Sequence, residues 1–249
     1  MIDGLVSIIT PSYNSEKYIK ETINSVQNQT YQNWEMIITD DGSVDNSVSV
    51  IEEMKKNDSR IKLHKMANSG PAFARNNSIK NAKGQYLAFL DSDDLWFPEF
   101  LSTSISFVKD SDGFVFSSYK RCNEITLEEE YTDFIVPAKV TYHDILKTNS
   151  ISCLTAFIDI KKLGKNLMPE VMYRQDMGLW LSYLKKIKHA KGIKETLAIY
   201  RIRKESHSRN KKKLLKPQWY FYRNVEKLSL MASIYYMLIW AYRGMRKYR

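Results

Sequence analysis

The chain has 249 residues, enough for a core that removes roughly 70–75% of the unfolded surface from water, and its length allows one large domain or two small ones. Its apolar and aromatic content is ordinary and Gly and Pro are sparse, which excludes a fibrous or largely disordered chain. The net charge of +10 is concentrated in residues 201–249, which hold 14 Lys and Arg against two acidic residues and are therefore suited to attract phosphates.

The first ninety residues alternate between strand and helix patterns. Short apolar runs predict strands at Leu5–Thr10, Trp34–Thr39, Ile61–His64 and Tyr86–Leu90. Apolar residues spaced by three and four predict helices at Tyr18–Val26, Val48–Met54 and Ala72–Ala82. Asn14-Ser15 is expected to cap the first helix. This order implies a mostly parallel sheet with helices on both faces, and ligands at the carboxyl ends of its strands.

The pattern loosens after Pro98. We expect elements at Glu99–Val108 (helix), Gly113–Tyr119 (strand), Cys153–Ile158 (strand), Asp176–Ile187 (helix) and Leu197–Ile202 (strand), with an acidic stretch at Glu124–Asp133. The fold class is therefore α/β, with a C-terminal helical appendage.

The chain carries few compartment signals. Cys122 and Cys153 lack metal-ligand spacing, which suits a reducing compartment, and we expect both to be inert. The apolar stretch Leu5–Ile9 is too short for a signal peptide or a membrane span. We therefore expect a cytoplasmic protein, with peripheral contact on the inner face of the membrane as an option that depends on the C-terminal tail.

Asp91, Asp93 and Asp94 follow the predicted strand Tyr86–Leu90. Carboxylates this close repel one another unless a proton, a basic partner or a hard metal ion neutralises them, and oxygen ligands suit Mg²⁺ or Mn²⁺. A bound cation could hold a diphosphate. The alternative is a solvated turn whose carboxylates cap the next helix.

Four predicted strand ends carry polar motifs: Pro11-Ser12-Tyr13-Asn14, Asp40-Asp41-Gly42-Ser43, Asn68–Arg75 and Asp91-Ser92-Asp93. In a parallel sheet they converge on one crevice, which we interpret as a nucleotide pocket. Tyr13 can stack on a base, Asp41 can accept a ring N–H, and Asp91 or a metal at Asp93 can meet ribose and diphosphate. Alternatively, Tyr13 packs the first turn and Arg75 pairs with a surface carboxylate.

The segments VSIITPSYN, TDDGSVDNS, NSGPAFARN and LAFLDSDD resemble the N-terminal half of family 2 inverting glycosyltransferases of GT-A fold. RQDMGLWLSYL (174–184) resembles their later Glu/Asp-Asp motif. IYRIRKESHSRNKKK (199–213) is similar to the Tyr-Arg-rich segment of bacterial members that build surface polysaccharides. The resemblance covers nearly the whole chain.

The resemblance implies roles for matching positions. Asp176 would be the general base, and Asp93 would bind Mn²⁺ or Mg²⁺. The nucleotide-binding candidates are Pro11, Tyr13, Asn14, Asp41, Asn68, Gly70, Arg75, Asp91 and Ser92. Gln175 departs from the pattern, because many members have Glu there, and Arg203 stands near the place of a metal-binding His found in some relatives. Asp176 could alternatively be only a first-turn acid favoured by the helix dipole.

We divide the chain into a GT-A domain (1–203), a basic flexible loop (204–216) and an amphipathic helical tail (217–249). The domain comprises a nucleotide-binding half (1–97) and an acceptor-binding half (98–203). Arg201, Arg203 and Lys204 are candidates for a lid that closes over the diphosphate and excludes water. The plainer reading of this basic run is a solvated loop.

The tail contains 15 uncharged residues, LSLMASIYYMLIWAY, between Lys227 and Arg243. They are too few for a confident span of a ~30 Å hydrocarbon core but suit an interfacial helix. The helix would contact an anionic inner membrane, or it would pack on the domain or at a homodimer interface.

The expected function is metal-dependent, inverting transfer of a sugar from a nucleotide-diphosphate donor, a UDP-sugar by preference, to a glycan or lipid-linked acceptor in bacterial cell-surface polysaccharide biosynthesis. One alternative is a sugar-nucleotide pyrophosphorylase, although Pro11–Asn14 is not its glycine- and arginine-rich phosphate loop. The other is a basic nucleic-acid-binding module, which would bind RNA or DNA through the tail without needing Asp93.

Overall fold

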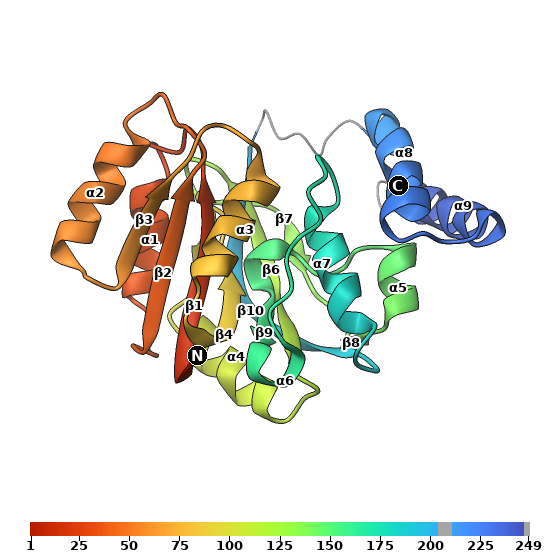
Figure 1. Cartoon of the computed structure of the whole chain (residues 1–249), viewed down its shortest axis with the longest axis horizontal. Helices are drawn as coiled ribbons and strands as arrows, with labels where there is room; N and C mark the ends of the chain where they lie inside the picture. The colour runs from red at the N-terminus through yellow and green to blue at the C-terminus, as the bar shows by residue number, and fades with distance from the viewer. Residues whose placement is uncertain (204–210, 247–249) are drawn as a thin grey trace.

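A mixed β-sheet runs through the middle of the molecule, and helices cover both of its faces (Figure 1). The computed structural model describes residues 1–203 and 211–246. Its strands are β1 (Ile2–Ser12), β2 (Trp34–Asp40), β3 (Ile61–Lys65), β4 (Gly84–Phe89), β5 (Leu95–Trp96), β6 (Phe114–Asn123), β7 (Glu129–Phe134), β8 (Lys139–Val140), β9 (Phe157–Asp159) and β10 (Ala190–Ile202). Its α-helices are α1 (Ile19–Gln27), α2 (Ser47–Asn57), α3 (Pro71–Asn81), α4 (Phe100–Lys109), α5 (Tyr142–Lys147), α6 (Ile160–Leu163), α7 (Gln175–Leu184), α8 (Lys211–Tyr220) and α9 (Leu230–Arg246). A 3₁₀ turn, η1 (Cys153–Thr155), and a π-helix, η2 (Phe221–Val225), complete the elements.

The sheet order is β3-β2-β1-β4-β9-β6-β10-β5, with β7 beside β6 and β8 beside β10. The first four strands pair in parallel, as the alternating pattern predicts. The second half is mixed, because β9 runs antiparallel to both β4 and β6, whereas β6 and β10 are parallel. The α/β class is thus confirmed, and the parallel arrangement is concentrated in the half that carries the motifs.

Two apolar layers hold the sheet between its helices. Val6 and Ile8 of β1 pack in the layer of α1 and α4, whereas the adjacent Ile9 packs in the layer of α3 and α7. Successive side chains of a strand point to opposite faces, so a strand covered on both sides becomes a continuous apolar run. Burial of each such side chain contributes about 1.5–3 kcal/mol relative to exposure. This packing makes β1 a rigid support for the motif at its end.

The expected strand Cys153–Ile158 is wrong in its first half. Residues Cys153–Thr155 form the turn η1, and only β9 is extended. Thr155 N–H donates to the Ser152 carbonyl at 3.1 Å, and Trp96 Nε1 donates to the Leu154 carbonyl at 2.7 Å. These bonds satisfy the backbone locally, so the apolar run does not need a strand partner there.

Other strands and helices also differ from those expected from the sequence, each for a physical reason. β10 begins at Ala190, well before the expected Leu197, because two register shifts around Thr196 interrupt the alternation. The acidic stretch contributes β7, an exposed strand antiparallel to β6. Helix α5 was missed, although its capping box was visible in the sequence: Thr141 caps the helix and Asp144 bonds back to Thr141 N–H.

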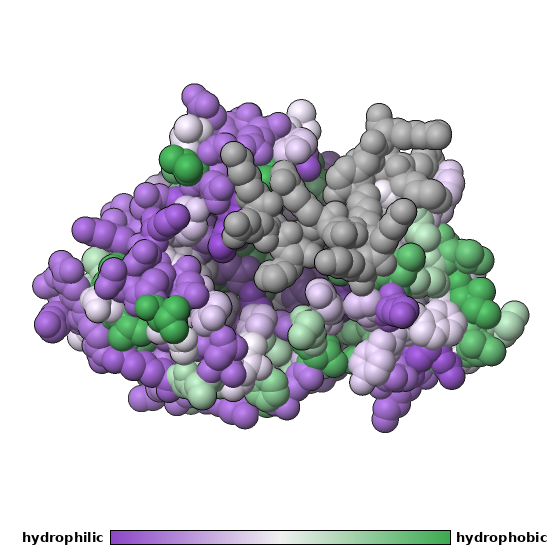
Figure 2. All heavy atoms as spheres, turned by 90° about the horizontal axis from the view of Figure 1, so that it is seen from above, coloured by the Kyte–Doolittle hydropathy of each residue, from purple (hydrophilic) through white to green (hydrophobic). Residues whose placement is uncertain are grey.

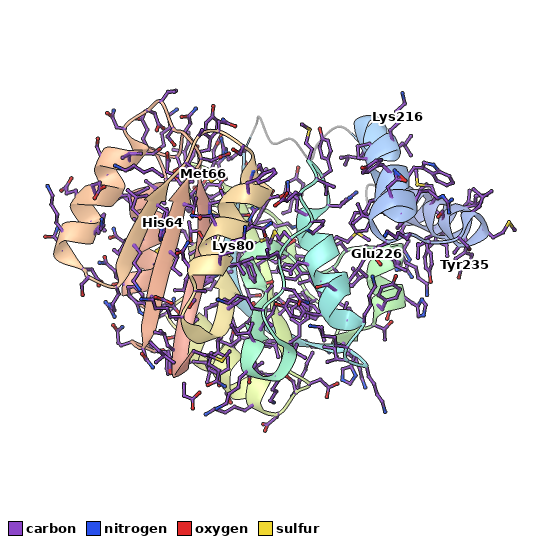
Figure 3. The ribbon with its side chains drawn as sticks, in the orientation of Figure 1. His64, Met66, Lys80, Lys216, Glu226 and Tyr235 are labelled. Carbon is purple, nitrogen blue, oxygen red and sulfur yellow. The ribbon has the colours of Figure 1, made fainter. Side chains whose placement is uncertain are left out.

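The C-terminal segment folds back onto the domain. Residues 211–216, expected within the basic loop, form the start of α8; Lys is a favourable helix residue, and Gln218 and Phe221 anchor the segment by burial. Residues 204–210 of that loop lie outside the described residues. Further along, Tyr142 Oη donates to Glu226 at 2.7 Å, and His143 Nδ1 lies 2.6 Å from Tyr236 Oη. Figure 3 shows Glu226 where the tail meets α5.

Candidate active site

A cavity of about 960 Å³ opens at the carboxyl ends of β1, β2 and β4. Every predicted nucleotide-binding residue and Asp93 line it, as do Arg201 and Arg203. The complete lining comprises Pro11, Ser12, Tyr13, Asn14, Asp41, Asn68, Gly70, Pro71, Ala74, Arg75, Asp91, Ser92, Asp93, Tyr200, Arg201 and Arg203. Sequence reasoning missed Tyr200, whose position beside Arg201 at the end of a strand was the available signal.

Asp41 organises the loop between β3 and α3. Its two carboxylate oxygens accept the N–H groups of Ser69 and Gly70, each at 2.8 Å. Gly70 has φ 103°, a region that side chains rarely adopt, and Pro71 begins α3 directly after it. Each carboxylate oxygen keeps a lone pair for a second donor, so Asp41 can shape the loop and bind a ligand N–H together.

Asn14 does not cap α1 as expected. It has φ 48°, its N–H donates to Ser43 Oγ at 2.9 Å, and its Oδ1 accepts Val44 N–H at 3.0 Å. Asn tolerates this left-handed conformation, and the two bonds tie the loop after β1 to the loop after β2. The neighbouring Tyr13 is 49% exposed, so its ring is available to a ligand in the cavity.

Arg75 connects Asp91 in the cavity lining to Gln175 at the start of α7. Its guanidinium donates to Asp91 Oδ1 at 2.6 Å and to Gln175 Oε1 at 3.3 Å. Burial opposes its charge, but the negative charge of Asp91 raises the pKa of the Arg75 guanidinium overall. The surface-pair alternative for Arg75 is therefore wrong, since the side chain is only 13% exposed. Gln175, the departure from the family pattern, serves here as a neutral acceptor.

Asp176 stands outside the cavity lining, in the first turn of α7 and one residue beyond Gln175. Its Oδ2 accepts a hydrogen bond from Asn149 Nδ2 at 3.0 Å. The preceding Arg174 has φ 65°, and its guanidinium lies 5.5 Å from the ring centre of Trp240 in α9. Sequence reasoning missed Asn149, which belongs to no recognisable motif, and it gave no role to Arg174, the first residue of the segment RQDMGLWLSYL.

Close packing holds α7 in this position. A Cβ added at Gly178 would lie 2.4 Å from Pro169 Cγ and 3.4 Å from Phe221 Cε2, so the helix approaches both the preceding loop and η2 through a glycine. The first turn that carries Asp176 is therefore held on two sides.

The aspartates after β4 have different surroundings. Burial and the negative charge of Asp91 raise the pKa of the Asp93 carboxyl, although Arg203, 3.0 Å away, opposes the rise. Burial raises the pKa of Asp94 well above its usual value, and Asp94 Oδ1 accepts Arg201 N–H at 2.9 Å. Asp91 is engaged by Arg75. Asp91 and Asp93 both line the cavity, and each is paired with an arginine, Asp91 with Arg75 and Asp93 with Arg203.

Asp93 and its surroundings fit a divalent cation that is bound together with a phosphate-containing ligand. Mg²⁺ is commonly bound by one or two carboxylates together with substrate phosphates, and Asp93 can supply one. Within residues 1–203 and 211–246 the structure holds no group of three or more His, Cys, Asp or Glu side chains arranged for a metal. The described residues therefore do not form a metal site without further ligands from a bound molecule.

Arg201 differs from the mobile lid residue that we expected. It lies in β10 and is 2% exposed; its guanidinium pairs with Glu21 and donates to the Asp93 carbonyl at 2.8 Å. These bonds make it part of the cavity wall. Arg203 is half-exposed and paired with Asp93, so its side chain has room to change partners. Lys204 lies outside the described residues.

Cys122 and Cys153 form no disulfide in the structure. Burial raises the pKa of both the Cys122 and the Cys153 thiols, which disfavours the reactive thiolate at neutral pH.

Comparison with known proteins identifies the class. The chain is 40% identical over 246 residues to the putative teichuronic acid biosynthesis glycosyltransferase TuaG of Bacillus subtilis, covering 98% of this chain and 97% of that protein. It is also 40% identical over 253 residues to the UDP-Glc:alpha-D-GlcNAc-diphosphoundecaprenol beta-1,3-glucosyltransferase WfgD of Escherichia coli, covering 100% and 96%. The structure of S. aureus TarS residues 1–349 in complex with UDP-GlcNAc superimposes with a TM-score of 0.71 at 21% identity, covering 95% of this chain and 71% of that one.

The fold is that of a glycosyltransferase of GT-A type. The model of glycosyl transferase family 2 matches residues 7–162, and the chain belongs to that family. Its relatives include one protein named for teichuronic acid biosynthesis and one named for glucosyl transfer to a GlcNAc-diphosphoundecaprenol. Membership of a transferase family favours the first of the three functions considered above over the pyrophosphorylase and the nucleic-acid-binding module.

Proposed function

We propose that this enzyme is a metal-dependent, inverting glycosyltransferase that uses a UDP-sugar and extends a glycan or lipid-linked acceptor of a bacterial surface polysaccharide. The observation that carries the proposal is the single cavity into which Tyr13, Asp41 and Asp93 all open, connected to Asp176 through Arg75 and Gln175. WfgD is named as a UDP-glucose enzyme, and TarS was crystallised with UDP-GlcNAc, which supports a uridine donor.

The nucleoside would lie against the ends of β1 and β2. Tyr13 offers a half-exposed ring for stacking on the base, a contact that aromatic faces favour. Asp41 keeps lone pairs that can accept the N–H of a uracil ring, while its bonds to Ser69 and Gly70 hold it in place. Asp91, held by Arg75, is a fixed acceptor for a ribose hydroxyl.

The diphosphate would lie near Asp93 and Arg203. A divalent cation held by Asp93 would neutralise charge on the departing nucleotide diphosphate. In the structure Arg203 provides positive charge to Asp93, from 3.0 Å away. We infer that Arg203 releases Asp93 when the donor binds and turns to the phosphates, where its planar guanidinium can donate two hydrogen bonds.

Asp176 would remove the proton of the attacking acceptor hydroxyl. A general base needs a defined orientation and a proton within hydrogen-bond reach, and Asn149 provides the orientation by holding one carboxylate oxygen. Attack from the face opposite the diphosphate passes through an oxocarbenium-like transition state and inverts the anomeric centre. The acceptor hydroxyl, after losing its proton to Asp176, forms the new C–O bond as the bond to the diphosphate breaks.

Calorimetric titration with UDP and with GDP, each with and without Mn²⁺, tests the donor and the metal together. We expect preference for UDP, tighter binding with Mn²⁺, and loss of the Mn²⁺ effect in Asp93→Ala. Asp3→Ala, a change of an exposed aspartate at the start of β1, is the matched control and should behave like the wild type. Equal binding of UDP and GDP, or a Mn²⁺ effect that survives Asp93→Ala, would contradict the proposal.

The role of Asp176 has a separate test. Asp176→Asn keeps the shape and a hydrogen-bonding partner for Asn149 but removes the base, so kcat should fall by about 10²-fold or more while UDP binding stays unchanged. Analysis of the product's anomeric configuration by NMR should show inversion.

A further inference from the structure

Helix α9 divides its large side chains between two faces. Ser233 and Tyr236 are buried, and Ala232 and Met237 pack beside them against the core. The opposite face exposes six large apolar residues at spacings of about one turn: Leu230 (53% exposed), Met231 (76%), Ile234 (41%), Tyr235 (53%), Leu238 (66%) and Tyr242 (56%). We call these six residues the α9 apolar face. A helix that packs on a domain by one face normally presents polar residues on the other.

The α9 apolar face is contiguous and lies at one end of the molecule. Figure 2 shows hydrophobic side chains gathered over α9 at the right, at the end of the molecule away from α2. Figure 3 shows Tyr235 on the outer side of the helix, away from the sheet. Isolated exposed apolar residues are ordinary, but a continuous exposed patch marks an interaction surface.

The charges around this face are positive. From Lys211 to Arg249 the sequence contains ten Lys and Arg and a single acidic residue, Glu226. Glu226 is turned inward, where it accepts from Tyr142 and pairs with Lys185 at 2.8 Å. Lys227 and Arg243 are exposed at the two ends of the apolar run. The partner of this face must therefore tolerate both apolar contact and a surplus of positive charge.

We propose that the α9 apolar face docks the enzyme on an anionic lipid bilayer, lying in the plane of the interface. An apolar face flanked by basic residues, with Tyr at its margin, is the pattern of interfacial helices. None of the helices that the structure describes is long and apolar enough to cross a membrane. A second copy of the chain is the less suitable occupant, because a two-fold contact would place the basic ends of both helices against each other.

This inference deepens the proposed function and rests on it for its consequence. The docked helix touches the region of the proposed base, since Trp240 of α9 lies against Arg174, two residues before Asp176. Tyr222 Oη also donates to the Leu146 carbonyl in α5 at 2.5 Å, so the tail is bonded to the half of the domain that carries Asp176. An acceptor anchored in the same bilayer would reach the enzyme from this side.

Cosedimentation of the full chain with vesicles tests the proposal. The vesicles are phosphatidylcholine alone or an equal mixture of phosphatidylcholine and phosphatidylglycerol. We expect binding to the anionic vesicles, weakened by salt, and little binding to phosphatidylcholine. Leu230→Ser with Leu238→Ser should reduce the partition coefficient about tenfold or more.

The matched control is Ile2→Ser with Ile135→Ser, two apolar residues with exposed fractions of 51% and 56% that lie away from α9. It should bind vesicles like the wild type. Lys227→Gln with Arg243→Gln should weaken binding to anionic vesicles only. Thermal melting and UDP titration of every variant show whether the fold and the donor site are intact, so a failure of the lipid proposal is separate from a failure of the donor proposal.

Three results would overturn the inference. The first is unchanged vesicle binding after the α9 substitutions, and the second is equal binding to neutral and anionic vesicles. The third is absence of vesicle binding together with a dimer, detected by light scattering, that the α9 substitutions convert to a monomer; the face would then join two copies of the chain.

Discussion

Asn149 Nδ2 donates a hydrogen bond to Asp176 Oδ2 over 3.0 Å, which connects the loop after α5 to the first turn of α7. This contact restricts the rotation of the Asp176 carboxylate by holding one of its two oxygens. A base that is held in one orientation loses less freedom when the acceptor hydroxyl arrives. Asn149 is in this view a positioning residue, which acts through Asp176.

We therefore expect Asn149→Ala to lower kcat about tenfold while the donor KM stays unchanged. Asn81→Ala, which removes an exposed amide bonded to the Asn77 carbonyl in α3, is the control and should leave both quantities unchanged. A rise in the donor KM that accompanies the fall in kcat would indicate a merely structural role.

Arg75 and Asp91 form an ion pair that is largely buried, with side-chain exposures of 13% and 27%. Arg75→Met leaves Asp91 without its cation and Gln175 without its donor, so the free energy of unfolding should fall by about 3 kcal/mol. Lys161→Met breaks the exposed pair with Asp3 and should cost at most about 1 kcal/mol. Urea unfolding of both variants measures the contrast. Equal losses would show that the Arg75 pair is as weakly coupled as a surface pair.

Arg203 and a divalent cation compete for Asp93 if the proposed function is correct, because Arg203 now lies 3.0 Å from its carboxylate. Arg203→Ala should consequently strengthen the binding of Mn²⁺ alone, by about 3- to 10-fold, since Mn²⁺ no longer displaces a cation. The same variant should weaken UDP binding in the presence of Mn²⁺, because a donor to the phosphates is lost. Calorimetry with Mn²⁺, and then with UDP at saturating Mn²⁺, measures the two effects. Changes of the same sign would exclude the exchange of partners.

The sequence predicts the nucleotide-binding half of the molecule well, because the apolar periodicity and the polar motifs agree there. Apolar runs buried on both faces reveal the parallel strands, and the residues that follow each strand necessarily meet at one edge. The cavity therefore contains every nucleotide-binding candidate, from Pro11 to Ser92. What each residue contacts depends on distant loops: neither the bonds from Asp41 to Ser69 and Gly70 nor the left-handed Asn14 follows from periodicity.

The second half of the chain was harder to predict because tertiary contacts decide its structure. Strand β10 is interrupted by register shifts, and η1 replaces part of an apolar run by local hydrogen bonding. Asn149 reaches Asp176 across 27 residues of sequence, so no motif could indicate the pair. The tail is ambiguous in sequence, because α9 carries apolar residues on all of its sides. Only the structure separates its two faces, through the burial of Tyr236 and the exposure of Leu238.

Asp94 gives the stability of this protein an unusual dependence on pH. It is 1% exposed, and burial together with the negative charges of Asp93 and Asp91 raises its pKa well above that of an ordinary aspartate. A carboxyl whose pKa is higher in the folded state contributes stability that is fully present below about pH 3.8, its unfolded value, and is lost as the pH rises through the folded value. At neutral pH Asp94 therefore contributes less to stability than it does under acidic conditions.

Asp94→Asn should raise the melting temperature at pH 7.5 by about 2–4 °C, because the amide has no charge to bury. Its Oδ1 can still accept Arg201 N–H, which Asp94 accepts at 2.9 Å. The gain should shrink as the pH is lowered toward 4, where Asp94 itself becomes neutral. Asp3→Asn, at an exposed carboxylate, should show no comparable gain. A variant that is less stable than the wild type at pH 7.5 would mean that the attraction of Arg201 for the Asp94 charge outweighs the cost of burying it.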